Sequence, residues 1–326
     1  MKAMLCSQFG GPDILALESV RNPALRAGEV RIEVHACGIN FPDVLMVKGQ
    51  HQLTPALPFI PGGEVAGIVT EIGPDVTTHS PGQRVMAVTF TGGLAEEVIA
   101  PAHTAIPIPQ EMDFTTAAVF QGGHTVAHYA LKRRGQLAEG EVLLVLGAAG
   151  GVGLAAVQLG KAMGALTIAA ASTEKKLACV VQNGASETIN TSTEDIKEKV
   201  KALTGGRGAD VIFDPVGGDQ FDQATRCINV NGRILVVGFA SGRIPQYPVN
   251  LALLKSCSIV GVNHQQFFVT APAHAQADIA ELLRMYQEGL IKPIIDRVYE
   301  LKNAAGALAH VGERRAIGKV VVSVRA

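Results

Sequence analysis

A glycine-rich stretch in the middle of the chain has the spacing of a phosphate-binding turn. It lies between an apolar run and a run of small and apolar residues, and it begins at Gly147. In such a turn one glycine lets the backbone approach a pyrophosphate, and the last lets the helix pack close to the strand. Gly150 and Gly153 keep this pattern, whereas Ala148 replaces its first glycine. The N–H groups that open the following helix also attract anions. The stretch therefore predicts a dinucleotide site built from Ala149, Gly150, Gly151, Val152 and Gly153; the alternative is a packing turn without a ligand.

The segment about 20 residues further on indicates which dinucleotide is bound. An NAD site places an acid there, at the end of the second strand, to hold the ribose hydroxyls. This chain has Ala171 at that point, followed by Ser172 and, slightly later, Lys175 and Lys176. Ser172 can hydrogen-bond a 2′-phosphate, and Lys176 can supply the counter-charge. We therefore expect NADPH; the alternative, a lysine on a solvated helix face, is the interpretation we favour for Lys175.

The elements around the turn must place these residues at one edge of a sheet. We expect strands at residues 143–146 and 167–170 and helices at residues 152–163, 174–182 and 194–203, with further strands at "DVIFDPVG" and "GRILVVGFAS". This alternation predicts an α/β fold with a doubly wound parallel sheet. Asp214 ends one strand at the carboxyl edge, where such folds bind ligands.

The first third of the chain has a different pattern. Val30, Ile32, Val34 and Ala36 alternate with polar residues, which is typical of a half-buried strand. Short strands with frequent Gly and Pro turns predict a mainly β, barrel-like domain. We place the changes of domain near residues 122 and 257.

Composition limits the classes of function. Lys and Arg number 28 against 29 Asp and Glu, giving a net charge of −1 without the basic excess of a nucleic-acid-binding protein. The five cysteines never form a C-x-x-C pair, which is typical of reduced thiols in a cytoplasmic protein. We see neither a signal peptide nor an apolar run of membrane-spanning length.

Four stretches together resemble a known superfamily. They are "VHACGINFPDVL", "PFIPGGEVAGIVTEIGPDV", "AAGGVGLAAVQLGKAMGA" and "DPVGGDQFDQATRCINVNGRILVVGFASG". The chain resembles the medium-chain dehydrogenases/reductases over nearly its whole length, and among them the zinc-independent NADPH:quinone oxidoreductases of zeta-crystallin type. The resemblance implies a GroES-like catalytic domain (residues 1–122 and 258–326), a Rossmann NADPH-binding domain (residues 123–257), an active site in the cleft between them, and a homodimer.

The resemblance also implies that no metal is used. Zinc-dependent relatives carry a cysteine and a histidine at positions that hold Asn40 and Gly63 here. Cys37 lies three residues before Asn40, and we interpret it as a small buried thiol. Residues 84–101 contain no cysteine for a structural zinc lobe, and no local set of three or four ligands replaces the missing ones.

Several substrate-side residues follow from the resemblance. Asn40 takes the place of a polar residue near the nicotinamide, and His51 takes the place of a frequent tyrosine; the alternatives are a turn-forming asparagine and an exposed loop histidine. The threonine near the nicotinamide falls on Thr125 or Val126. Thr191 replaces a tyrosine near the 2′-phosphate. The strand end at Gly238, Phe239 and Ala240 resembles the backbone that lines the nicotinamide pocket.

Without a Lewis acid, oxidation of an unactivated alcohol is difficult, whereas reduction of an electron-poor acceptor needs mainly positioning. We therefore expect a metal-independent reductase that transfers hydride from NADPH to a quinone. The alternatives are an NADPH-dependent enoyl or alkenal reductase and a non-catalytic NADPH-binding protein.

Overall fold

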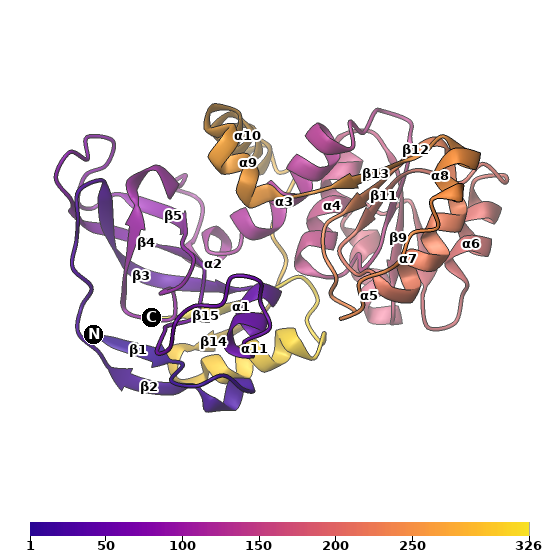
Figure 1. Ribbon diagram of the computed structural model, residues 1–326. Helices are drawn as coiled ribbons and strands as arrows, with labels where there is room; N and C mark the ends of the chain where they lie inside the picture. The colour runs from indigo at the N-terminus through magenta and orange to yellow at the C-terminus, as the bar shows by residue number, and fades with distance from the viewer. Residues whose placement is uncertain (326) are drawn as a thin grey trace. The chain divides into compact units, whose positions relative to one another are not determined.

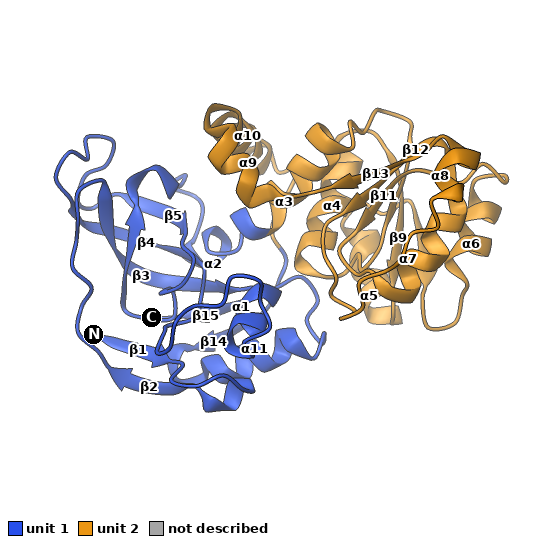
Figure 2. Cartoon of the chain, in the orientation of Figure 1, with its two compact units in different colours: residues 1–122, 294–326 blue, residues 123–293 orange. Residues whose placement is uncertain are grey.

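The chain divides into two compact units. The computed structural model describes residues 1–325. Unit 1 consists of Met1–Gly122 and Ile294–Ala326, and unit 2 of Gly123–Pro293 (Figure 2). Unit 2 thus extends to Pro293, whereas the sequence predicts a change of domain near residue 257. The reason is that strand β13 (Ser258–Gly261) pairs with the parallel sheet of unit 2.

Unit 2 is a parallel sheet covered by helices. Its six strands have the order β10-β9-β8-β11-β12-β13, and every neighbouring pair is parallel. The chain starts at β8 in the centre, runs outward to β10 and then returns to β11, so the order reverses between β8 and β11. This is the strand order of a Rossmann fold, which places ligands at the reversal, and it confirms the predicted fold class. The remaining strands are β8 (Val142–Val145), β9 (Leu166–Ala171), β10 (Glu187–Asn190), β11 (Ala209–Asp214) and β12 (Ile228–Val236).

Helices connect the parallel strands because each connection must cross the sheet. In Figure 1, α3 and α4 lie on one side of the sheet and α6 and α7 on the other. The helices of unit 2 are α3 (Val126–His128), α4 (Gly151–Ala162), α5 (Glu174–Gln182), α6 (Ile196–Leu203), α7 (Gly218–Ala224), α8 (Asn250–Lys255), α9 (His264–Thr270) and α10 (Pro272–Gln287), and π-helical turns at Gln121–Thr125 and Tyr129–Arg134 flank α3.

Unit 1 is built around a mainly antiparallel sheet of order β14-β15-β3-β4-β5-β7, with β6 paired to β3. The predicted alternation holds in β3, where Val30, Ile32 and Val34 are fully buried. The elements of this unit are β1 (Lys2–Leu5), β2 (Ala16–Ser19), β3 (Glu29–Ile39), α1 (Phe41–Val47), β4 (Glu64–Ile72), β5 (Arg84–Val88), β6 (Glu97–Pro101), β7 (Ala105–Pro107), α2 (Phe114–Ala117), β14 (Ile295–Glu300), α11 (Ala304–Gly312) and β15 (Lys319–Ser323).

Within residues 1–325, every helix is too short or too polar to cross a lipid bilayer.

Candidate functional site

The turn between β8 and α4 presents backbone N–H groups at the carboxyl edge of the sheet. Gly147 has φ +56, a conformation that favours glycine, and the Ala148 N–H donates to the Ala170 carbonyl of β9 at 2.9 Å. Helix α4 then begins at Gly151, with Gly150 as its N-cap and without a capping side chain. The first N–H groups of a helix have no acceptor within it. The turn can therefore bind an anion through its backbone.

The protein's own packing excludes a side chain at one glycine of this turn but not at another. A Cβ at Gly153 would lie 2.3 Å from the Gly147 carbonyl oxygen, so the packing of α4 against the turn requires glycine there. Gly150 is exposed, has φ −78, and its Cβ would meet no protein atom closer than 3.4 Å. The protein's own packing thus leaves room for a side chain at Gly150. A phosphate group that approaches the backbone would explain its absence, so this turn fits a dinucleotide.

The ends of β9 and β10 lie side by side, and neither strand ends in an acid, although Glu174 and Glu194 accept hydrogen bonds from Asn190 at the end of β10. The Thr191 N–H donates to the Ala171 carbonyl at 2.9 Å, and the Ser192 hydroxyl donates to the Ser172 carbonyl at 2.8 Å. Ser172 is exposed, and Lys176 is partly exposed in the first turn of α5. The structure therefore brings Ser172, Lys176 and Thr191 to one edge. It adds Ser192 at the same edge.

Asp214 supports the neighbouring turn. Its side chain is fully buried, and its Oδ1 accepts the N–H groups of Val216 and Gly217 at 2.8 and 2.9 Å. Burial raises the pKa of the Asp214 carboxyl to about 6, opposed by these two hydrogen bonds. Its main-chain carbonyl accepts from Val237 and from Gly238. A contact of this side chain with the cofactor remains a prediction.

The segment after β12 lies against the same turn. The Ala240 N–H donates to the Pro215 carbonyl at 3.1 Å, and the Ser241 N–H donates to the Val216 carbonyl at 2.8 Å. Gly238, Phe239 and Ala240 are all partly exposed. The predicted cofactor residues thus follow β8, β9, β11 and β12 at the carboxyl edge of one sheet, although contact of each with a dinucleotide stays a prediction.

In unit 1, a second polar group lies at the ends of three neighbouring strands. Asn40 follows β3, Glu64 begins β4 and Lys319 begins β15. The register pairs Glu64 with Gly38 and Val320 with Ile39. Because β3 lies between β4 and β15, these side chains reach the same end of the sheet.

Hydrogen bonds connect the three side chains. The Lys319 ammonium donates to Asn40 Oδ1 at 2.5 Å and to Glu64 Oε2 at 3.2 Å. Asn40 Nδ2 donates to the same Glu64 oxygen at 3.0 Å. The other oxygen, Oε1, accepts the Gly122 N–H at 2.6 Å. Glu64 and Lys319 are only 2% and 5% exposed, so each buried charge has the other as its partner.

Asp43 adds a buried carboxyl close to this group. Its Oδ2 accepts the Asn40 main-chain N–H at 2.7 Å, which fixes the start of α1. Burial raises the pKa of Asp43 to about 6, with nearby Glu64 acting in the same direction and Lys319 in the opposite one. The Cys37 thiol is fully buried, and burial raises its pKa well above the usual value, as expected for an inert thiol.

The other two predicted substrate-side residues lie elsewhere. His51 is in the loop after α1, and its Nδ1 contacts the backbone of Leu53 within the same turn. Thr125 is buried at the end of a π-helical turn in unit 2, whereas Val126 is partly exposed. The preceding His124 contacts Gln158 of α4 at 3.0 Å. Roles of His51 and Thr125 in the reaction remain predictions.

The position of the missing zinc histidine has no room for a side chain. A Cβ at Gly63 would lie 2.8 Å from the Thr89 carbonyl oxygen, which itself belongs to the backbone of the sheet end. Asn40, the other replaced position, is engaged by Lys319 and Glu64. The residues present here therefore do not fit a zinc ion of the kind that zinc-dependent relatives hold.

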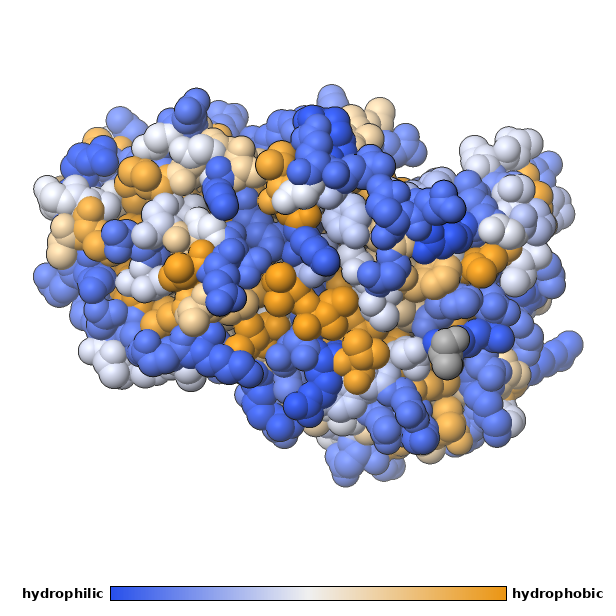
Figure 3. Space-filling model, turned by 180° about the vertical axis from the view of Figure 1, so that it is seen from behind, coloured by the Kyte–Doolittle hydropathy of each residue, from blue (hydrophilic) through white to orange (hydrophobic). Residues whose placement is uncertain are grey.

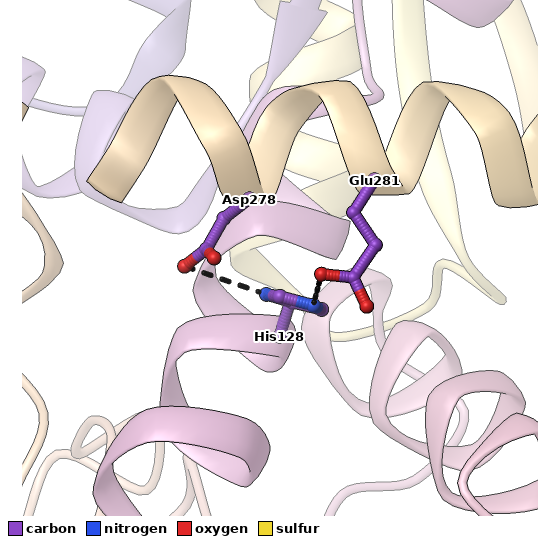
Figure 4. Close-up of side chains that lie close together, drawn as sticks. All are labelled: His128, Asp278 and Glu281. Carbon is purple, nitrogen blue, oxygen red and sulfur yellow. Dashed lines mark ion pairs between the residues drawn. The ribbon is translucent and has the colours of Figure 1, made fainter. Parts of the chain in front are cut away.

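Among residues 1–325, one other group brings a histidine and two carboxylates together (Figure 4). His128 is fully buried, with Nδ1 3.6 Å from Asp278 and Nε2 3.4 Å from Glu281. Its two nitrogens face different carboxylates, although one ligand atom from each of the three residues lies within 4.8 Å of the others. Arg133 and Lys132 also already neutralise Asp278 and Glu281, respectively. These charge contacts connect α3 to α10, and we assign no metal ion to the group.

Comparisons with known proteins agree with both units. Residues 26–110 match the alcohol dehydrogenase GroES-like domain, and residues 151–288 match the family described as zinc-binding dehydrogenase. Quinone oxidoreductase-like protein 2 homolog of Nematostella vectensis is 39% identical over 326 residues, covering 99% of this chain and 89% of the relative. Quinone oxidoreductase of Homo sapiens is 33% identical over 309 residues, covering 94% of this chain and 92% of the relative.

A solved structure gives the same result. Escherichia coli quinone oxidoreductase complexed with NADPH superposes with a TM-score of 0.92 at 29% identity, covering 99% of this chain and all of the other. A GroES-like domain joined to a Rossmann domain defines the medium-chain dehydrogenases/reductases, which are nucleotide-binding oxidoreductases. Within that class, this chain belongs to the zinc-independent quinone oxidoreductase branch.

Proposed function

We propose that this oxidoreductase reduces quinones with NADPH and without a metal ion. The observation that carries the proposal is the group around Asn40, where a carboxamide held between an ammonium and a carboxylate stands in place of zinc ligands. Such a group can donate a hydrogen bond to an oxygen that gains negative charge, but it cannot activate an alcohol as a Lewis acid does. Kinship to quinone oxidoreductases at 33–39% identity supports the same acceptor class.

Unit 2 would hold the cofactor. The backbone N–H groups at the start of α4 would bind the pyrophosphate, and Gly150 would leave it room. Ser172 and Lys176 would bind the 2′-phosphate, which NADPH has and NADH lacks. The segment from Gly238 to Ala240 would line the nicotinamide. When bound, NADPH supplies the hydride.

Unit 1 would supply the donor for the acceptor oxygen. Reduction of a quinone adds one hydride and one proton, giving the hydroquinone and NADP⁺. Asn40 Nδ2 would donate a hydrogen bond to the oxygen as its charge develops, and His51 would be a second donor. Neither residue would act as a nucleophile, and solvent can deliver the proton afterwards. Because protonation by solvent remains possible, replacing either donor should slow turnover on the order of tenfold.

The test is NADPH oxidation with three acceptor classes in the presence of a chelator: 1,4-benzoquinone, crotonaldehyde and crotonyl-CoA. We expect the quinone to be the fastest acceptor and EDTA to leave the rate unchanged. Reduction of crotonaldehyde or crotonyl-CoA without reduction of the quinone would favour the enoyl or alkenal reductase. Tight NADPH binding without turnover of any acceptor would favour a non-catalytic NADPH-binding protein.

We further propose a homodimer formed through the β13 side of unit 2. Strand β13 is an edge of the parallel sheet, and such an edge has unpaired backbone groups. Leu253 and Leu254 of the adjacent helix α8 are 82% and 71% exposed, and Val249 just before it is 78% exposed. On the face drawn in Figure 3, apolar side chains also reach the surface in several places. A second copy of the chain would cover the edge and the leucines together.

We also propose a reducing compartment, the cytoplasm, as the site of action. All five cysteines have free thiols, and four of them are buried. Such thiols persist where glutathione and thioredoxin keep them reduced.

A further inference from the structure

We propose that Lys319 and Glu64 are positioning residues that fix the Asn40 carboxamide as a hydrogen-bond donor toward the acceptor oxygen. This inference rests on the proposed function, because such a donor is useful only where an oxygen gains negative charge. Nothing in the sequence pattern had singled out Lys319, which lies 279 residues from Asn40.

The orientation of the carboxamide follows from the charges around it. Its Oδ1 accepts from the Lys319 ammonium at 2.5 Å, and its Nδ2 donates to Glu64 at 3.0 Å. If the amide were flipped, the NH₂ group would face the ammonium and the oxygen would face the carboxylate. Both contacts would then be repulsive, and an ammonium has no acceptor while a carboxylate has no donor. The two buried charges therefore allow only one of the two orientations.

The locked orientation leaves one donor on Asn40. Nδ2 carries two hydrogens, and Glu64 accepts one of them. Asn40 is partly exposed, in contrast to Glu64 and Lys319, so the second N–H is the group that can meet another molecule. An ammonium on Oδ1 also withdraws electron density from the amide, which strengthens the remaining N–H as a donor.

The buried position makes this arrangement rigid. Glu64 Oε1 is held by the Gly122 N–H at 2.6 Å, and the Asn40 backbone is held by Asp43 at 2.7 Å. Lys319 opens a strand that pairs with β3 directly beside Asn40. Each partner is thus fixed by its own element, as preorganised donors in active sites require.

The test uses a variant that removes both charges together. Lys319→Met alone would leave Glu64 as an unpaired buried charge and could prevent folding, so the variant is E64Q/K319M. A matched control is R31M/E97Q, which removes the 3.1 Å Arg31–Glu97 ion pair between β3 and β6 of the same sheet. Stopped-flow single turnover with NADPH and 1,4-benzoquinone measures the reductive step, and thermal unfolding and the NADPH Kd check the fold.

We expect E64Q/K319M to slow the reductive step about tenfold, the same effect that we expect of Asn40→Ala, with an unchanged NADPH Kd. Adding N40A to E64Q/K319M should slow it no further, since the pair acts through Asn40. R31M/E97Q should keep the wild-type rate. A folded E64Q/K319M with the wild-type rate, or a triple variant about a hundredfold slower, would overturn the proposal.

A second measurement does not depend on activity. In protein labelled with ¹⁵N-asparagine, the side-chain signals of Asn40 are those lost in N40A. We expect both of its amide protons to shift in E64Q/K319M and to stay in place in R31M/E97Q. Unshifted signals would refute the positioning role even if quinones are reduced. Shifted signals in a protein that reduces no acceptor would uphold the fixed orientation and reject the proposed function.

Discussion

At the scale of single residues, Lys176 is the side chain on which the choice of cofactor should depend most. It lies in the first turn of α5, after an end of β9 without acids. Lys176→Ala should weaken NADPH binding by about 1–3 kcal/mol, the range for a hydrogen bond to a charged group, and leave NADH binding nearly unchanged. Fluorescence titration of both cofactors measures this. Lys175→Ala, at the exposed position directly before Lys176, is the control and should change neither Kd. Equal losses for NADPH and NADH would mean that Lys176 does not bind the 2′-phosphate.

Asp214 gives a prediction about stability and pH. Its folded pKa of about 6 is above its ordinary value of 3.8, so the folded protein disfavours the ionised carboxylate. Oδ1 accepts both turn hydrogen bonds, whereas Oδ2 has no hydrogen-bond partner among residues 1–325. Asp214→Asn can keep both bonds and removes the buried charge. At pH 8 the variant should be more stable by roughly 1–3 kcal/mol.

The sign of this effect sets its pH window. As pH falls through about 6 toward 4, the wild-type carboxyl becomes protonated in the folded state first, so wild type gains stability and the difference shrinks. Urea unfolding at pH 8, 6 and 4.5 measures it. Asp219→Asn, an exposed acid in the next helix, is the control and should show little change. A D214N variant that is less stable than wild type at pH 8 would contradict the argument.

At the scale of elements, the β8–α4 turn contains one glycine that packing requires, Gly153, and one that a bound ligand would require, Gly150. Gly150→Val should fold normally, since φ −78 suits any residue, and should weaken NADPH binding at least tenfold. Gly153→Ala should instead lower the free energy of unfolding by about 1–3 kcal/mol, because its Cβ would overlap the Gly147 carbonyl. Thermal unfolding and NADPH titration distinguish the two. A well-folded G150V that binds NADPH as wild type does would show that the turn only packs.

Elements with strong local patterns could be predicted from the sequence. Helix α5 has the predicted bounds, and β8, β9 and α4 differ from prediction by a residue or so at their ends. The local signals were sufficient because glycines and caps fix where these elements begin and end.

The group around Asn40 could not be predicted in the same way. Glu64 and Lys319 meet Asn40 only because β4 and β15 both pair with β3. Strand neighbours far apart in the chain leave no local periodicity to detect. For the same reason the sequence does not predict β13 as part of the parallel sheet, because its partner is β12.

At the scale of the whole molecule, the exposed edge of unit 2 determines the last prediction. The unpaired edge strand β13 beside exposed leucines is unfavourable in a monomer, because unpaired strand edges and apolar side chains promote association. Burying one leucine side chain contributes about 1.5–3 kcal/mol to association, and in a symmetric dimer the same leucine is buried on both copies.

We therefore expect light scattering after gel filtration to give twice the chain mass of 34.1 kDa. Leu253→Glu with Leu254→Glu should convert the protein to monomers without unfolding it, since both side chains are exposed within the chain. Leu166→Glu, at a 53% exposed position that begins β9, is the matched control and should remain dimeric. A wild-type protein that is monomeric at all concentrations would contradict the dimer. A dimer that persists in the double glutamate variant would place the contact elsewhere.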